Sequence, residues 1–305
     1  MDDFNRIIFI MSSTIRMSVP LILVTLSATL QVRSGIMDLG CEGMMIAGAV
    51  FGVLGSYLSG SAWVGVLFAV VFGALFSLVH VFLHVTYKVN PTISGMSVNL
   101  LASAIAPLLV MLVWGRQTLS DKVPAFNKID IAAVEKIPMI GKILNEQTIF
   151  FYLSLILAFL MWLVLFRTTI GLRLRMVGEN PKAANTIGIN VVKYKYIGTL
   201  LGGALAGLGG AALSIGQLDM FIEGMTAGRG YIAIVINAFG RFHPLGAVVG
   251  SLFFGFFDSL QMVFQGVLIP SQILMMMPYF FTLLVVSFGL SRSSSPAGLS
   301  KHHDM

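Results

Sequence analysis

The sequence predicts an all-α, polytopic membrane protein, and three observations lead to this fold class. Of the 305 residues, 57% are hydrophobic and only 10% are charged, whereas a soluble domain has about 25% charged residues. The apolar residues gather in repeated stretches, each long enough to cross a bilayer as a helix of about 20 residues. Within these stretches the apolar residues are continuous rather than alternating, which argues against a transmembrane β-barrel.

Nine apolar segments are expected to form transmembrane helices, with broken or re-entrant segments among them. They cover roughly residues 14–32, 40–58, 63–86, 92–114, 148–166, 196–216, 229–241, 245–265 and 270–290. Segment 229–241 is too short to cross as a straight helix, which takes about 20 residues. It is therefore predicted to be half of a broken helix or a re-entrant segment. The chain is expected to form a single transmembrane domain over residues 1–305.

Basic residues set the predicted orientation in the membrane. With nine crossings, eleven Lys and Arg residues fall on the side of loop 167–195, and seven, including Arg229, fall on the side of loop 115–147. Cytoplasmic loops of membrane proteins carry the excess of Lys and Arg. Loop 167–195 is therefore predicted to be cytoplasmic, and loop 115–147 and the N-terminus are predicted to be external.

A short helix is predicted within loop 167–195, in the stretch "RMVGENPKAANTIGINVVKYK". Asn180 is a good N-cap, Pro181 suits the first helical position, and Gly188 suits the position after the helix, where φ is positive. Residues 181–187 then form about two turns, roughly 10 Å long.

One face of this helix carries small side chains. Ala183, Ala184 and Ile187 share it by helical spacing. A helix shorter than about 12 residues is marginal by itself in water, so we predict that this face docks in a groove on a partner. The alternative is a capped turn that only reverses the chain.

Several stretches resemble the membrane permease subunit of bacterial ABC importers. They are "TTIGLRLRMVGENPKAANTIGINVVKYK", the following "GGALAGLGGA" and the later "EGMTAGRGYIAIVINAFGRFHPLGAVVGSLFFG". The branch is the one that contains ribose-type sugar permeases. The opening "VRSGIMDLGCEGMMIAGA" resembles its nucleoside and simple-sugar members, which work with a binding lipoprotein of the basic-membrane-protein type. The likeness covers about residues 14–290.

The resemblance implies a coupling helix at residues 178–190, which would sit in a groove of a cytoplasmic ATPase. The positions that carry this role are Gly178, Glu179, Asn180, Pro181, Ala183, Ala184 and Gly188. It also implies a second permease, often a different chain, and a location in the bacterial inner membrane. The sequence contains no G-x-x-x-x-G-K-[ST] motif, so ATP and Mg are expected on the partner ATPase and no cofactor is expected in this chain.

Polar residues within the spans are candidates for a translocation pathway. They are Glu42, Asn99, Gln217, Glu223, Asn237, Asp258 and Gln261. Ionisable residues inside a membrane usually face protein or a water-filled path. Amides can bind sugar hydroxyls or a base edge, but they also tie helices together. Asp38 is instead expected near the membrane surface, where it caps a helix start.

An internal repeat points to the same region. "MDLGCEGMMIAG" at 37–48 recurs as "LDMFIEGMTAG" at 218–228, with Asp, Glu, Gly and Met in the same spacing. An odd number of crossings separates the copies, so they are predicted to lie in opposite orientation. Inverted repeats with glycine-interrupted segments are typical of transport pathways through broken helices.

Other motifs favour packing over chemistry. Gly202, Ala206 and Gly210 form a ridge of small residues that permits close helix approach. His80 and His84 stand four apart on a predicted helix, as metal ligands can, but no third ligand is near in sequence, so we expect no metal site.

The sequence therefore predicts a permease subunit of an ATP-driven importer for a nucleoside or simple sugar, without a catalytic site of its own. Riboflavin-like cargo is an alternative for the same role. An ion-driven secondary transporter is a second alternative, in which Asp38, Glu42 or Asp258 carries the coupling ion. A membrane enzyme is disfavoured, because no paired carboxylates, H-E-x-x-H or G-x-S-x-G pattern supplies a reacting centre.

Overall fold

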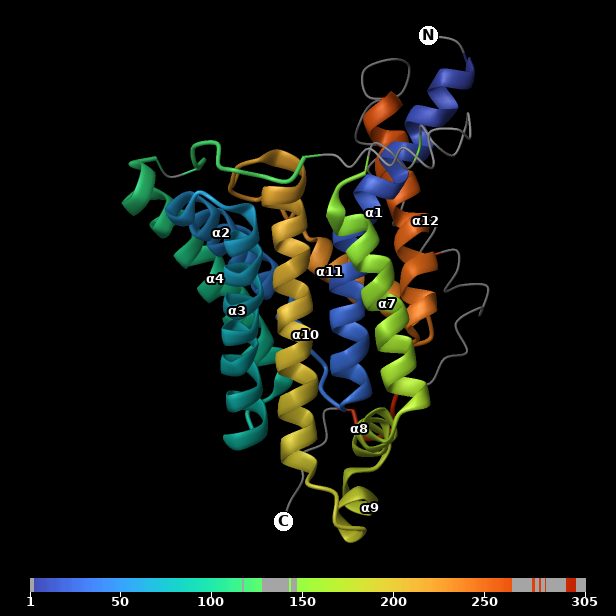
Figure 1. Ribbon diagram of the computed structural model, residues 1–305. Helices are drawn as coiled ribbons and strands as arrows, with labels where there is room; N and C mark the ends of the chain where they lie inside the picture. Colours follow the sequence, from blue (N-terminus) through green and yellow to red (C-terminus); the bar gives the residue numbers. More distant parts are fainter. Residues whose placement is uncertain are drawn as a thin grey trace.

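The computed structural model describes residues 3–116, 118–127, 143, 147–264, 276–277, 280, 283 and 295–299. Their regular secondary structure is helical, apart from one isolated antiparallel bridge between Leu119 and Ile222. Figure 1 shows the arrangement. The helices are α1 (Asp3–Arg33), α2 (Cys41–Ser59), α3 (Ala62–Val81), η1 (Phe82–Thr86), α4 (Pro91–Trp114), α7 (Ile149–Arg167), α8 (Thr169–Glu179), α9 (Pro181–Thr186), α10 (Val191–Leu213), η2 (Ser214–Leu218), α11 (Arg229–Phe239) and α12 (Pro244–Phe264).

Seven helices of the described chain are long and apolar enough to cross a membrane. They are Ile7–Arg33, Cys41–Ser59, Ala62–Thr86, Pro91–Trp114, Ile149–Arg167, Val191–Leu218 and Pro244–Val263. Each corresponds to one predicted segment, and α11 corresponds to the short segment 229–241. The ninth segment, 270–290, lies almost wholly outside the described residues, so the count of nine stays a prediction.

Two helices begin inside the bundle rather than at its ends. The irregular segment 34–40 precedes α2, and the irregular segment 219–228 precedes α11. Four residues of the second segment have positive φ: Asp219 at 60°, Gly224 at 76°, Ala227 at 48° and Gly228 at 77°. Glycine adopts this region without the Cβ clash that other residues meet. The prediction that 229–241 does not cross as a straight helix matches the structure, in which α11 is a short helix of eleven residues.

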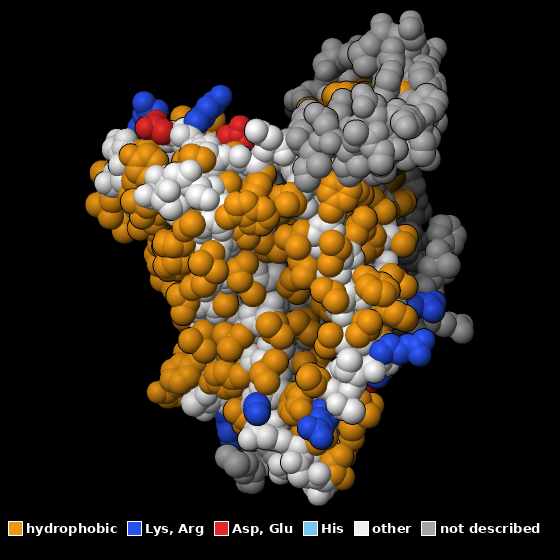
Figure 2. Space-filling view, viewed as in Figure 1, with side chains coloured by type: hydrophobic (Ala, Val, Ile, Leu, Met, Phe, Trp, Pro, Cys, Tyr) orange, Lys and Arg blue, Asp and Glu red, His pale blue; other side chains and the backbone are white. Residues whose placement is uncertain are grey.

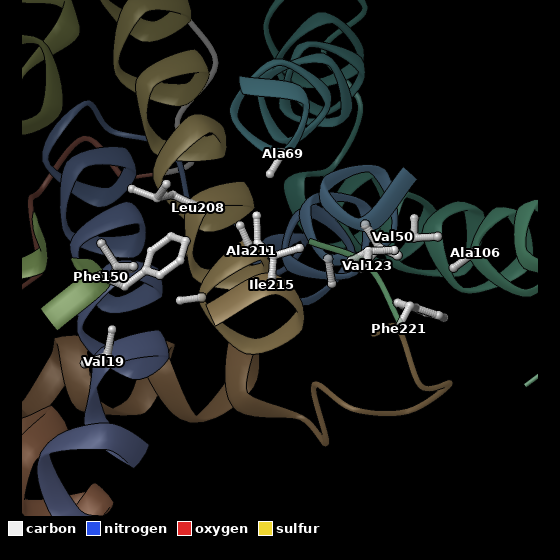
Figure 3. Close-up of a cluster of buried hydrophobic side chains, with 14 of the residues drawn as sticks. Val19, Val50, Ala69, Ala106, Val123, Phe150, Leu208, Ala211, Ile215 and Phe221 are labelled. Atoms are coloured by element: carbon white, nitrogen blue, oxygen red, sulfur yellow. The ribbon is translucent and has the colours of Figure 1, made fainter. Parts of the chain in front are cut away.

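The glycine-rich helix α10 lies at the centre of the packing. Gly207 faces the backbone of α3 at Ala69 and Gly73, and Gly210 faces the backbone of α2 at Met45. A Cβ atom at either glycine would overlap these backbone atoms, so the helices can approach only because it is missing. The apolar core around the end of α10 joins α1, α2, α3 and α7 (Figure 3).

The two ends of the bundle differ in structure. At one end, the described part of predicted loop 115–147 packs on 215–223: Ser120 N–H donates to Phe221 O at 3.0 Å, and Glu223 N–H donates to Thr118 O at 2.9 Å. The helices α8 and α9 lie at the opposite end (Figure 1). Apolar side chains cover the face between the ends, and Lys and Arg gather toward the ends (Figure 2). This is the surface expected of a multi-pass membrane protein.

Candidate functional site

A cavity of about 360 Å³ lies where α2, α4 and the 219–231 segment meet. Its polar lining consists of Glu42, Asn99, Ser103, Glu223, Thr226 and Tyr231. Asn99 is eight residues from the start of α4, which places this cavity roughly 12 Å along that helix. The cavity thus lies within the span, and three of the predicted pathway residues, Glu42, Asn99 and Glu223, line it.

Glu42 is a buried carboxylate that binds the start of α11. Its Oε1 accepts hydrogen bonds from Thr226 Oγ1 at 2.6 Å and from Gly228 N–H at 3.0 Å. Its Oε2 accepts one from Gly230 N–H at 2.7 Å. The first N–H groups of a helix have no partner within it, and a negative charge there is favourable. Glu42 of α2 therefore caps α11, which leaves it less available for a transported molecule than the sequence suggested.

Asn99 of α4 binds the start of α2, as Glu42 binds the start of α11. Its Oδ1 accepts from Gly43 N–H at 2.7 Å, in the first turn of α2. Its Nδ2 donates to Leu39 O and to Tyr231 Oη, both at 2.8 Å. Asn99 of α4 thus ties together the start of α2 and the start of α11. No pattern in the sequence pointed to Thr226 or Tyr231, because their partners lie far away in the chain.

The two copies of the internal repeat meet at this point. Thr226 and Gly228 of the second copy donate to Glu42 of the first. The helices run in opposite directions from there. Tyr57 near the end of α2 makes an edge-to-face contact with Trp114, whereas the residues after α11 contact Arg33 at the other end. The predicted opposite orientation of the copies therefore agrees with the geometry.

Asp38 does not lie near the membrane surface, so its predicted location is wrong. Asp38 is 4% exposed and lies inside the bundle, although its Oδ1 does accept from Gly40 N–H at 2.6 Å, just before α2. The same oxygen is 3.6 Å from His80 Nε2, and His80 Nδ1 is 2.9 Å from Ser94 Oγ. Asp38, His80 and Ser94 form a buried polar cluster that joins segment 34–40 to α3 and α4.

The remaining pathway candidates mostly contact neighbouring helices. Asn237 Oδ1 accepts from Thr29 Oγ1 at 2.8 Å, and Gln217 Nε2 donates to Arg16 O at 2.8 Å. Asp258 lies 4.0 Å from Arg229 Nη2. Arg229 is thus paired inside the bundle and is not a residue of an external loop, as its place in the charge count assumed.

Gln261 and Glu223 differ from these in exposure. Gln261 of α12 is partly buried, and Glu223 is exposed at the cavity rim. Glu223 lies at the rim toward the end of the bundle formed by 118–127, where an exposed carboxylate is accessible to a molecule that enters the cavity. Glu223 is therefore a better candidate than Glu42 for contact with a passing molecule.

The predicted short helix is present as α9, Pro181–Thr186. Asn180 is the N-cap, with Oδ1 accepting from Ala183 N–H at 3.1 Å. Gly188 has φ of 80°, as predicted for the residue after the helix. The predicted docking face is partly wrong: Ala184 is fully buried and packs with Val177 and Val191.

The outward face of α9 is therefore smaller than predicted. Ala183 and Ile187 are exposed, while Ala184 and Pro181 are buried. An isolated six-residue helix is unstable, and the buried side chains stabilise α9 on the start of α10. The α8–α9 elbow, residues 169–188, thus projects from the bundle as an ordered unit (Figure 1).

The elbow contacts the end of α1 at close range. A Cβ atom at Gly35 would lie 3.1 Å from Gly178 Cα, and one at Gly178 would overlap Arg33 O. On the same side, Glu179 Oε2 accepts from Ala297 N–H at 3.1 Å. Only glycine permits this approach, which gives Gly178 a packing role at the joint between elbow and bundle.

Aromatic and basic side chains complete the joint. The guanidinium carbons of Arg175 and Arg33 lie 4.7 and 6.0 Å from the centre of the Phe166 ring. The ring of His243 is 4.7 Å from that of Phe166. Burial and the nearby Arg33 lower the pKa of His243, so this joint carries positive charge on the arginines alone near neutral pH.

Comparisons with known proteins agree with this architecture. A family model described as "Branched-chain amino acid transport system / permease component" matches residues 10–286. The guanosine ABC transporter permease protein NupQ of Bacillus subtilis is 37% identical, over 97% of this chain and 96% of its own. The nucleoside ABC transporter permease protein NupC of Lactococcus lactis is 36% identical, over 97% and 96%.

One solved structure has a similar fold. It is described as an inward-facing, metal-chelate type ABC transporter and aligns with a TM-score of 0.51, over 92% of this chain and 87% of that chain, at 18% identity. These matches confirm the resemblance to ABC importer permeases, which are transport components rather than enzymes. With seven long apolar helices, the chain is a multi-pass protein of the bacterial inner membrane. It belongs to the branched-chain amino acid transport system / permease component family.

Proposed function

We propose that this chain is one of two permease subunits of an ATP-driven nucleoside importer, with the elbow docked on a separate ATPase. The observation that carries the proposal is the full-length likeness to NupQ and NupC, both of which are named for nucleosides. The ordered elbow at one end of the bundle supports the coupling role, because force can be transmitted only through a part that does not bend freely.

The cavity supports the second permease. Ser103 of α4 and Tyr231 of α11 line it and are exposed on the surface of this chain. Polar groups facing lipid at this depth are unfavourable. A second permease against this face would complete a polar path, and the hydroxyl, amide and carboxylate groups suit a neutral molecule rich in hydroxyls. A binding lipoprotein would dock at the end formed by 118–127 and 215–223.

Replacing residues 181–186 with a Gly-Ser linker of equal length tests the coupling role. In the full transporter in proteoliposomes, we expect the permease pair to assemble while nucleoside uptake falls to background, because the linker cannot transmit movement of the ATPase. The matched control replaces Tyr87 and Lys88, which form an exposed turn at the same end, with Ser and Gly. Uptake that survives the first replacement would contradict the assignment.

Competition for uptake tests the substrate class. Unlabelled guanosine, adenosine and cytidine should each reduce uptake of labelled guanosine, while ribose, glucose and riboflavin should not. Competition by a sugar or by riboflavin, but by none of the nucleosides, would overturn the nucleoside assignment while leaving the importer role in place. Uptake that depends on an ion gradient and not on ATP would overturn the assignment as an ATP-driven importer.

A further inference from the structure

We propose that α11 is a rigid connection between the elbow and the cavity, and that Arg33 and Glu42 are the positioning residues that hold its two ends. This inference rests on the proposed function, since it concerns how the elbow and the cavity move together. It gives a role to Arg33, which the sequence marked only as one basic residue among many.

The end of α11 at the cavity is held by charge. Glu42 accepts from Gly228 and Gly230 N–H and from Thr226 Oγ1, at 2.6 to 3.0 Å. The N–H groups of the N-cap Gly228 and of Gly230 are donors that the start of α11 leaves without helical partners, and the Thr226 hydroxyl adds a side-chain donor from the segment before the helix. The positive end of the helix dipole adds to the attraction. The same carboxylate lines the cavity, so a shift of α11 along its axis moves the cavity wall.

The opposite end of α11 is held by the opposite charge. Arg33 Nε donates to Phe242 O at 2.8 Å, and Arg33 Nη2 donates to Arg241 O at 3.2 Å. These two carbonyls lie just beyond the last helical residue, Phe239, in the turn that follows α11. Arg33 stands at the end of α1, so both ends of α11 are fixed by side chains from other helices.

The backbone after α11 is strained where Arg33 binds it. Arg241 and Phe242 have φ of 56° and 53°, a region that residues with a side chain seldom adopt. Two such residues in succession persist only where neighbouring groups hold them, and strain of this kind gathers at switch regions. Arg33 bonds to the carbonyls of both, which makes this turn sensitive to any displacement of the end of α1.

The elbow reaches this turn through α1. Gly178 at the end of α8 packs directly on the backbone of Arg33 and Gly35. Arg33 then contacts the turn after α11. Between its ends, α11 is tied to α1 by Thr29 and Asn237 and lies beside α12 through Arg229 and Asp258. Its eleven residues span about 16 Å, which covers the distance from the elbow joint to the cavity in one stiff element.

The test measures nucleoside imported per ATP hydrolysed by the full transporter, with both permeases, ATPase and binding protein, in proteoliposomes. Arg33→Gln should lower this ratio about five- to tenfold, the size of a typical coupling between sites. Arg33→Lys should not restore it, because a lysine cannot donate to two carbonyls in the fixed fork of arginine. ATPase binding and hydrolysis should persist in both variants, a result that mere loss of folding would not produce.

The cavity end is tested with Thr226→Val, which removes one donor to Glu42 and keeps the backbone donors. The ratio should fall, and the double variant with Arg33→Gln should lose less than the product of the two separate effects, because both act on one helix. The control is Lys88→Gln, an exposed basic residue at the elbow end, which should leave the ratio unchanged.

Two results would overturn the inference. One is a wild-type ratio of uptake to hydrolysis in assembled Arg33→Gln, whether or not both rates fall, and the other is a pair of separate effects that multiply in the double variant. If Arg33→Gln does not assemble, the inference is tested with Thr226→Val alone. A wild-type ratio of nucleoside imported per ATP hydrolysed in that variant would then overturn it. A wild-type chain that neither binds an ATPase nor supports uptake would instead refute the proposed function, and so the two failures are distinguishable.

Discussion

Gly210→Ala should lower the free energy of unfolding by about 2–4 kcal/mol, the upper part of the range for an overpacked core. The new methyl group would overlap Met45 O and Ala49 N of α2. These are backbone atoms of a helix that is itself buried, so no rotation of a flexible side chain can make room. We therefore expect a markedly lower melting temperature and a lower yield of monodisperse protein in detergent.

Gly52→Ala is the matched control for this substitution. Gly52 is also a buried helical glycine, but the nearest atom to its added Cβ would be Ala69 Cβ at 3.4 Å, an ordinary contact. Alanine is favoured over glycine inside a helix by up to about 1 kcal/mol. Gly52→Ala should therefore leave the melting temperature unchanged or raise it. Equal melting temperatures for the two variants would show that α10 does not pack as described.

Asp38→Ala should destabilise the protein by about 1–3 kcal/mol, as expected when a buried hydrogen-bond donor loses its acceptor. The change deprives Gly40 N–H of its acceptor at 2.6 Å and leaves His80 without the carboxylate at 3.6 Å. Asp38→Asn should be intermediate, since its amide oxygen can still accept from Gly40. Thermal unfolding in detergent measures the stability of the wild-type protein, of Asp38→Ala and of Asp38→Asn.

Asp121→Ala serves as the comparison for an exposed pair. Asp121 lies 3.5 Å from Arg116, and the two side chains are 59% and 63% exposed. Exposed ion pairs contribute about 0–1 kcal/mol, so this change should have little effect on the melting temperature. If Asp38→Ala were as mild as Asp121→Ala, the buried cluster would not hold segment 34–40 in place.

Local features of the chain were predictable from its sequence. The apolar runs gave the spans, because about 20 continuous apolar residues can satisfy their backbone groups in a bilayer only as a helix. Asn180, Pro181 and Gly188 gave α9, because capping depends on neighbours a few residues away. The shortness of segment 229–241 indicated, for the same local reason, that it does not cross as a straight helix.

Contacts between distant parts of the chain could not be obtained in this way. Glu42 meets Thr226 across 184 positions, and nothing in either stretch specifies that the carboxylate caps α11 rather than faces a transported molecule. The burial of Ala184 depends on Val177 and Val191, and helical spacing alone could not say which face turns inward.

The sequence by itself determined that this protein is a helical membrane protein with a short capped elbow, because hydropathy and capping act over neighbouring residues. Only the tertiary structure decided that Asp38 lies beside His80 and Arg229 beside Asp258. It also decided that Glu42 holds the start of α11 and that Arg33 holds the turn after it. Buried charges must find partners wherever the fold brings them, and those partners are set by helix packing rather than by position in the chain.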